Sequence, residues 1–234
     1  NAGQYSKVFS LSHTDPYTTI DGVSRTVSAT WRSISQFTTS SSDFETETGT
    51  LGLDYSWPLT EFQSVRMGIA AQRSDLFTDP NSSAAEALYW VQNNGNTYTE
   101  VQNVGIPPIA LTYYGTRFDT FEYSLGWSYD SRNRALFADR GSRHRLSASY
   151  ALPFSDIDFV SFNYDYLQFI PVSKWFTLMF NSEAGYGQAL GDTTSMPPYR
   201  RFFAGGPETV RGYRESRMGP RDSFGNPYGG NIKF

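Results

Sequence analysis

The sequence contains no cysteine, only two histidines and no long apolar run. Without cysteine, disulfide bridges and thiolate metal sites are excluded. His13 and His144 are far apart and lack the spacing of metal ligands, so no metal site is expected. No stretch of about 18 apolar residues is present, which excludes a transmembrane helix. It does not exclude barrel strands, whose alternating pattern escapes hydropathy averaging.

Two further absences concern partners and targeting. The formal net charge is −4, so nothing indicates the basic surface of a nucleic-acid-binding protein. The chain begins Asn-Ala-Gly-Gln and carries no signal peptide. We therefore expect either that a targeting segment has been removed or that the chain is a piece of something longer.

Aromatic residues are abundant where aliphatic ones are few. Aromatics make up 17% of the 234 residues, against 38% hydrophobic residues in all. This combination favours β-structure and a surface that meets a membrane interface. The length fits one large domain or part of one.

Alternating apolar and polar residues predict about eight β-strands. In the clearest of them, Leu51, Leu53 and Tyr55 alternate with Gly52 and Asp54. One face of nearly every strand is apolar or aromatic, and the other carries Gly, Ser, Thr, Asn and scattered charge. The predicted strands cover residues 5–12, 23–33, 51–57, 65–72, 120–129, 146–152, 162–166 and 176–184, and residues 232–234 begin a ninth.

The connections between these strands alternate in length. Short turns are predicted at 21–22, 58–62 and 171–174, and long loops at 35–47, at 74–118 and from 187 onward. The loop 74–118 is expected to be irregular apart from a short helix at 84–91. Two connections depart from the alternation, because the turn at 130–141 is longer than expected and that at 153–158 shorter. Short turns at one rim and long loops at the other are typical of outer-membrane barrels, so the loop 74–118 is predicted to be extracellular.

We predict an all-β fold, a transmembrane antiparallel β-barrel present in part. A half-apolar sheet in water needs a second layer, and no amphipathic helices are available to form one, whereas a barrel turns its apolar face to lipid. A soluble β-sandwich is the alternative. No nucleophile context or other catalytic signature is found, so neither enzyme activity nor a cofactor is expected. In the barrel, charges of both signs face the lumen and can pair across it: Asp54, Arg66, Glu122, Arg145, Asp165 and Glu183.

The most distinctive stretch is residues 202–213, Phe-Phe-Ala-Gly-Gly-Pro-Glu-Thr-Val-Arg-Gly-Tyr. No helix follows its glycines, which argues against a phosphate loop. Gly205-Gly206 and Gly229-Gly230 are instead predicted to form tight turns where a long loop leaves and re-enters the rim. In Val210-Arg211-Gly212-Tyr213, the arginine is either exposed or paired with buried acids, because an unpaired buried charge is costly. The residues alone leave both possibilities open.

This stretch, continued by Met218-Gly219-Pro220, resembles the loop between strands eleven and twelve of the BamA family, the barrel assembly proteins of the Gram-negative outer membrane. Further matches lie at Asp15-Pro16-Tyr17, Asp139-Arg140-Gly141 and residues 183–187, so the resemblance spans nearly the whole chain in order. The related TamA proteins and the two-partner secretion transporters share the arginine motif. The motif alone therefore does not separate these families.

The resemblance implies a sixteen-stranded barrel of the bacterial outer membrane, of which this chain supplies strands four to eleven and the start of twelve. It implies that residues 188–231 fold into the lumen, where Arg211 meets acidic residues on later strands that this sequence does not include. Residues 226–232 make a poor alternating strand, so the end at Phe234 is attributed to truncation and not to a sorting signal.

The function implied by the resemblance is insertion and folding of β-barrel proteins, without a cofactor. The implied partners are nascent outer-membrane proteins, accessory lipoproteins of the assembly complex and the lipid bilayer, with no nucleic acid. The alternative function is export of a partner protein by a two-partner secretion or TamA-like barrel.

Overall fold

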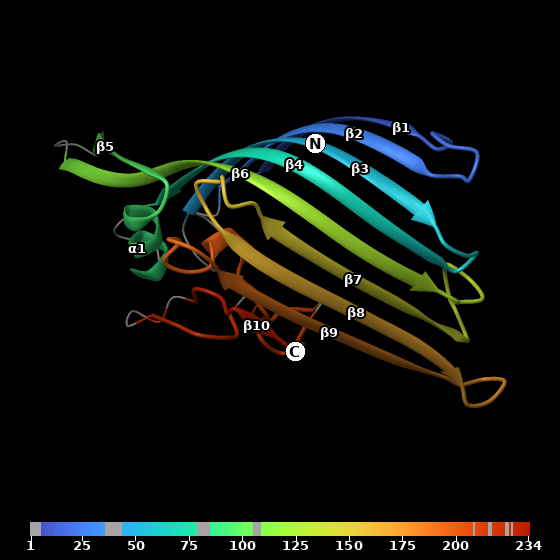
Figure 1. Ribbon diagram of the computed structural model, residues 1–234. Helices are drawn as coiled ribbons and strands as arrows, with labels where there is room; N and C mark the ends of the chain where they lie inside the picture. The colour runs from blue at the N-terminus through green and yellow to red at the C-terminus, as the bar shows by residue number, and fades with distance from the viewer. Residues whose placement is uncertain are drawn as a thin grey trace.

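A computed structural model describes residues 6–35, 44–78, 85–104, 109–207, 209–214, 217–222, 225 and 227–234. Across these residues, ten strands form one antiparallel sheet, and the prediction of an all-β fold is confirmed (Figure 1). The strand order is β1-β2-β3-β4-β6-β7-β8-β9-β10, with β5 paired only to β6. The strands are β1 (Ser6–Asp15), β2 (Ser24–Ser35), β3 (Phe44–Pro58), β4 (Gln63–Thr78), β5 (Asn96–Val104), β6 (Ile109–Asp130), β7 (Gly141–Ala151), β8 (Phe159–Pro171), β9 (Thr177–Ala189) and β10 (Ile232–Lys233).

Pairing between neighbouring strands places the alternating residues in rows. One such row on the apolar face runs Leu11, Ala29, Leu51, Ala71 and Phe121 from β1 to β6. Large side chains of this face are exposed, Leu51 among them at 65%. A second sheet covering this face is absent from the described part of the chain, so the β-sandwich alternative is wrong.

The long connections gather at one end of the sheet and the short turns at the other (Figure 1). The predicted loop 74–118 is wrong in extent, because β4 continues to Thr78, β6 begins at Ile109 and β5 lies between them. The helix expected at 84–91 is confirmed as α1 (Ala85–Asn93). Residues 79–84 and 105–108 of this predicted loop lie outside the described residues, and the extracellular position of the region stays a prediction.

These strands were missed because their outward face changes character. Arg73 and Asp75 of β4 continue the row positions of Ala71, but they form ion pairs with Asp119 and Arg117 of β6. The strand therefore outlasts its apolar pattern. The same holds for the predicted loop 35–47, whose residues 44–47 belong to β3, with Glu45 and Glu47 on the outward side; residues 36–43 lie outside the described part.

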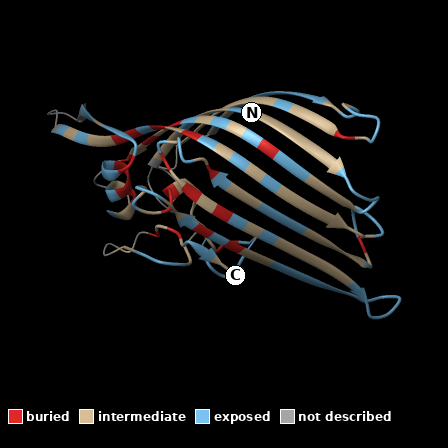
Figure 2. Cartoon of the chain, in the orientation of Figure 1, coloured by how far each residue is buried: buried red, intermediate tan, exposed pale blue. Residues whose placement is uncertain are grey.

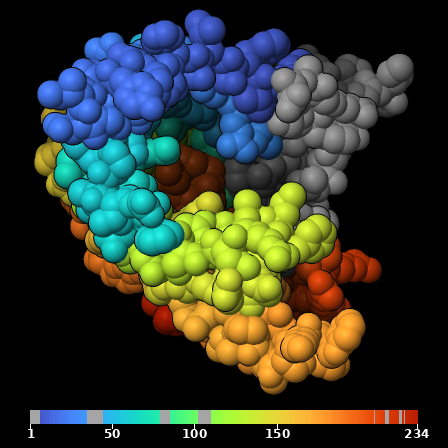
Figure 3. All heavy atoms as spheres, turned by 90° about the vertical axis from the view of Figure 1, so that its right-hand side faces the viewer, coloured from blue at the N-terminus to red at the C-terminus, as the bar shows by residue number. Residues whose placement is uncertain are grey.

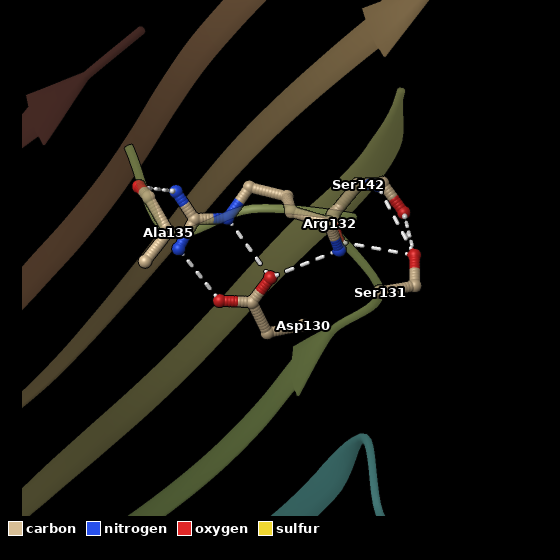
Figure 4. A network of polar contacts seen from close by, with 5 residues as sticks. All are labelled: Asp130, Ser131, Arg132, Ala135 and Ser142. Carbon is tan, nitrogen blue, oxygen red and sulfur yellow. Dashed lines mark hydrogen bonds and ion pairs between the residues drawn. The ribbon is translucent and has the colours of Figure 1, made fainter. Parts of the chain in front are cut away.

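The turn between β6 and β7 is long because it is built around an arginine (Figure 4). The Arg132 guanidinium donates to both carboxylate oxygens of Asp130, at 2.9 and 2.7 Å, and to the Ala135 carbonyl oxygen at 3.4 Å. Backbone contacts between Ser131 and Ser142 close the base. This hydrogen-bonded structure accounts for the length of the turn, which departs from the predicted alternation of short and long connections.

The sheet curves around a hollow, seen along the strands from the turn end in Figure 3. Buried residues gather near α1 and the last long loop and are sparse along the rest of the strands (Figure 2). The buried cluster includes Leu76, Trp90, Phe118, Phe159 and Met196. The core therefore lies between the concave face of the sheet and the loops folded against it. None of the helices in the described residues has the length and apolar character to cross a membrane.

Candidate functional site: a loop anchored across the lumen face

The polar side chains of the strands share the concave side of the sheet, here called the lumen face. Five of the six charges assigned to the lumen from the sequence line one cavity of about 700 Å³, together with many serines. Among the described residues, none of the six forms an ion pair with another of the six. Glu122 pairs with Arg200 and Glu183 with Lys233 instead. The five that line the cavity are Asp54, Arg66, Glu122, Arg145 and Asp165.

Arg200 ties the long loop after β9 to the lumen face. Its guanidinium lies 2.5 Å from the Glu122 carboxylate on β6, and both side chains are largely buried. The guanidinium also lies over the ring of Phe159, at 5.1 Å from its centroid. A partly desolvated, charge-assisted hydrogen bond backed by a cation–π contact is stronger than an exposed ion pair. The loop is thereby fixed at the middle of the sheet.

Tyr199 extends this contact into the buried cluster. Its ring stacks on Phe118 with centroids 6.0 Å apart, and Phe118 meets Trp90 of α1 edge-on at 5.5 Å. Burial raises the pKa of the Tyr199 hydroxyl to about 12. The aromatic stack links strand, loop and helix.

Two glycines of β9 make room for the loop to lie flat on the sheet. A Cβ atom at Gly185 would sit 2.6 Å from the ring of Phe202, and one at Gly187 would sit 2.9 Å from Cε of Met196. Both distances are shorter than side-chain contacts allow. The two positions face the lumen in alternation with Tyr186, whose side chain is exposed on the other face.

The outgoing and returning arms of the loop are joined beside these glycines. Phe202 and Gly230 exchange two backbone hydrogen bonds of 2.9 Å. Arg201 donates to the Met196 carbonyl oxygen at 3.0 Å, to Ser195 Oγ at 2.9 Å and to the Tyr228 carbonyl oxygen at 3.4 Å. Burial lowers the pKa of Arg201 from its usual value, although arginine remains charged.

Helix α1 and the residue that follows it, Asn94, hold the loop by hydrogen bonds to residues 194 and 195. The indole nitrogen of Trp90 donates to the Ser195 carbonyl oxygen at 2.8 Å. The side-chain amide of Asn94 donates to Thr194 Oγ1 at 2.6 Å and accepts from the Thr194 backbone at 2.9 Å. We call residues 190–204 the anchored segment, because contacts from the sheet, α1 and the returning arm all converge on it.

The predicted loop glycines adopt different conformations. Gly205, Gly206 and Gly229 have φ of 112°, 99° and 75°, whereas Gly230 pairs with Phe202. A side chain at Gly205 would also meet the carbonyl oxygen of Arg214. Gly205 and Gly206 turn the chain away from the anchored segment. The Gly206 backbone then donates to the Tyr213 carbonyl oxygen at 3.1 Å and closes the turn.

Residues 209–214, here the motif segment, carry the arginine singled out in the sequence. Val210, Arg211, Gly212 and Tyr213 are all exposed. In the part of the chain that the structure describes, Arg211 has no carboxylate partner. Its pairing with acids on later strands stays a prediction. The residues that do hold the loop were missed, although the basic and aromatic run 199–203 was a signal for them.

Comparisons with known proteins agree with this architecture. The model of the Omp85 superfamily domain matches residues 1–234. The outer membrane protein assembly factor BamA of Neisseria meningitidis serogroup B is 32% identical over 231 residues, which cover 96% of this chain and 27% of that protein. The crystal structure of BamA from Haemophilus ducreyi lacking POTRA domains 1–3 superimposes with a TM-score of 0.79 at 20% identity, covering 97% of this chain and 43% of that one. The chain thus spans about a quarter of the length of its curated relative.

Proposed function

The chain belongs to the Omp85 superfamily, and from this premise we propose that it forms part of an assembly factor that inserts and folds β-barrel proteins in the bacterial outer membrane. Its sheet is part of a transmembrane antiparallel β-barrel. The observation that carries the proposal is the 32% identity to an outer membrane protein assembly factor across nearly the whole chain.

We propose that this assembly requires no bond chemistry. The outward rows present apolar and aromatic side chains to lipid, as barrel walls do. The anchored segment lies across the lumen face and joins its strands to α1. We propose that such a barrel acts by templating client strands and by locally destabilising the bilayer. Nascent outer-membrane proteins and the accessory lipoproteins of an assembly complex are its proposed partners.

The motif segment has a proposed role within the same loop. We propose that Arg211, with Val210, Gly212 and Tyr213, fixes the outer part of the loop by binding acidic groups beyond the described residues. Its exposure leaves the guanidinium available for such a contact.

Reconstitution tests the function. The full-length protein, with its accessory lipoproteins, is placed in liposomes together with an unfolded β-barrel substrate of unrelated sequence. Folding is followed by the change in gel mobility of unheated samples, with empty liposomes as the control. We expect faster folding of several unrelated substrates. Export of one dedicated partner, without faster folding of the others, would instead support a two-partner secretion or TamA-like transporter.

A further inference from the structure

Strand β5 lies outside the continuous wall of the sheet. It pairs with β6 along its whole length, Asn96–Val104. The pair projects beyond β7, which reaches β6 only at Glu122, at the end of the sheet that carries the long connections (Figure 1). In the part of the chain that the structure describes, no other strand pairs with β5. We call its unpaired side the β5 edge.

The β5 edge differs from the two other open edges of the sheet, those of β1 and β9. Both of these strands lie in the curved path of the sheet, where the wall of a barrel continues from one strand to the next. Strand β5 is a branch of the sheet at β6 and is not part of that path. The barrel wall therefore does not supply a neighbour for the β5 edge.

The sequence of β5 has none of the common features that protect an exposed edge. Residues 96–104 contain no lysine or proline, their register with β6 has no bulge, and Glu100 is the one charged residue. Proteins use such features to prevent another strand from pairing. Every second residue of an edge strand directs both its backbone N–H and its C=O away from the neighbouring strand. This strand of nine residues thus presents a row of backbone donors and acceptors on its open side.

A cavity next to β5 has room for a side chain of a further strand. It measures about 340 Å³ and lies between β5 and the last turn of α1. Thr97 and Thr99 of β5 are among its walls, together with Val91 and Gln92 of the helix. A strand added at the β5 edge would therefore find space for one large side chain directed toward α1.

We propose that the β5 edge binds an extended polypeptide segment of another protein, which joins the sheet as a further antiparallel strand. Backbone hydrogen bonds supply the contacts along the edge, as in other cases of strand addition. Neutral β-branched and aromatic side chains suit the segment, because Thr97, Thr99 and Val101 share one face of β5 and cross-strand pairs of such residues are favourable. The edge lies outside the lumen, and the inference does not rest on the proposed assembly function.

The probe for this site is a synthetic, fluorescein-labelled peptide with the sequence of residues 109–117, Ile-Ala-Leu-Thr-Tyr-Tyr-Gly-Thr-Arg, because this sequence already pairs with β5. It is titrated onto the full-length protein in detergent micelles and followed by fluorescence anisotropy. We expect saturable binding that slows hydrogen exchange in residues 96–104. Absence of binding would overturn the proposal. Faster exchange in residues 109–117 of the protein would also overturn it, because the peptide would then have displaced β6.

Two N-methylated forms of the peptide test the mode of binding. One carries methyl groups on the amide nitrogens of its third, fifth and seventh residues, and the other on those of its fourth, sixth and eighth. An added strand directs only one of these sets toward β5. One form should therefore bind roughly 10-fold more weakly than the parent peptide, because backbone hydrogen bonds are lost, and the other should bind about as well. Equal binding of the two forms would refute strand addition.

Val101→Lys and Thr112→Lys locate the edge. The two residues lie opposite each other in the register of β5 and β6 and are both exposed, but only Val101 belongs to the edge strand. A lysine on an edge strand opposes pairing, so Val101→Lys should weaken binding of the peptide and Thr112→Lys should not. Gel mobility of unheated samples verifies that each variant is folded. Equal binding by the two variants would place the peptide elsewhere, and dimers of the protein that are lost in Val101→Lys would assign the edge to a second copy instead.

Discussion

The anchored segment and the motif segment belong to one loop but meet different surroundings. In the first, Arg200 pairs with Glu122, and Phe202 lies on Gly185. In the second, Arg211 and Tyr213 are exposed. Two arginines, eleven positions apart in the sequence numbering, therefore have different physical roles in these residues. A conspicuous motif need not be the part of a loop that holds it in place.

The largest effect is expected where the sheet and the anchored segment touch most closely. Gly185→Val places a branched side chain where the Phe202 ring lies, so the ring must leave the lumen face. We expect the anchored segment to become susceptible to protease while the strands stay folded. Limited proteolysis of the full-length protein in liposomes measures this. The double variant Gly185→Val/Phe202→Ala relieves the clash and should recover part of the protection; the same protection in Gly185→Val as in the parent would contradict the close contact.

Arg200→Ala comes next, because it leaves the Glu122 carboxylate partly buried without its partner. Loss of one member of a buried pair costs about 3–5 kcal/mol, and partial exposure here reduces the expected cost to about 2 kcal/mol. Hydrogen exchange at residues 195–203 should accelerate accordingly. The double variant Arg200→Ala/Glu122→Gln removes the orphaned charge and should exchange more slowly than Arg200→Ala. An unchanged exchange rate in Arg200→Ala would show that the ion pair does not hold the segment.

Arg211→Ala sharpens the comparison from the other side. Substitutions at exposed positions usually change stability by within about 0.5 kcal/mol, so hydrogen exchange of the anchored segment should hardly change. The proposed partner of Arg211 predicts a different outcome in function, namely slower folding of barrel substrates by the reconstituted protein. Arg211→Lys, which keeps the charge but not the planar fork, should fall between. Full activity in Arg211→Ala would remove the proposed role.

The smallest effect concerns the start of the anchored segment, where the Asp158 backbone accepts from Leu190 and donates to Thr193. Burial, followed by the nearby charge of Asp192, raises the pKa of Asp158. A carboxyl with a raised pKa in the folded state stabilises that state at low pH, and this contribution is lost as pH rises through the folded pKa. Asp158→Asn should therefore slow exchange at residues 190–194 at pH 7 but not at pH 3, with Asp156→Asn as the control. Faster exchange at pH 7 would contradict the sign.

The sequence predicted the strands wherever their outward face was apolar. Alternation located residues 51–57 and 120–129 well, because lipid-facing rows require it. It failed for residues 73–78 and for the first half of β6, where the ion pairs Arg73–Asp119 and Asp75–Arg117 interrupt the apolar pattern of the outward face. The extent of a strand follows from backbone pairing, which continues where the lipid pattern stops.

The site was only partly predictable for a different reason. The position of the loop in the chain and its glycine turns could be inferred from the local sequence. The contact of Arg200 with Glu122 joins residues 78 positions apart, and local patterns carry no information on such a pair. The role of Gly185 also depends on which side chain later arrives above it.

Strand β6 gives the fold a mechanical property. It runs without interruption from Ile109 to Asp130. The residues against which α1 packs and the Glu122 carboxylate that binds Arg200 therefore lie on the same strand. We expect a displacement of α1 to be transmitted along β6 to the lumen face. A ligand that bound α1 would then disturb the Arg200–Glu122 contact without entering the barrel.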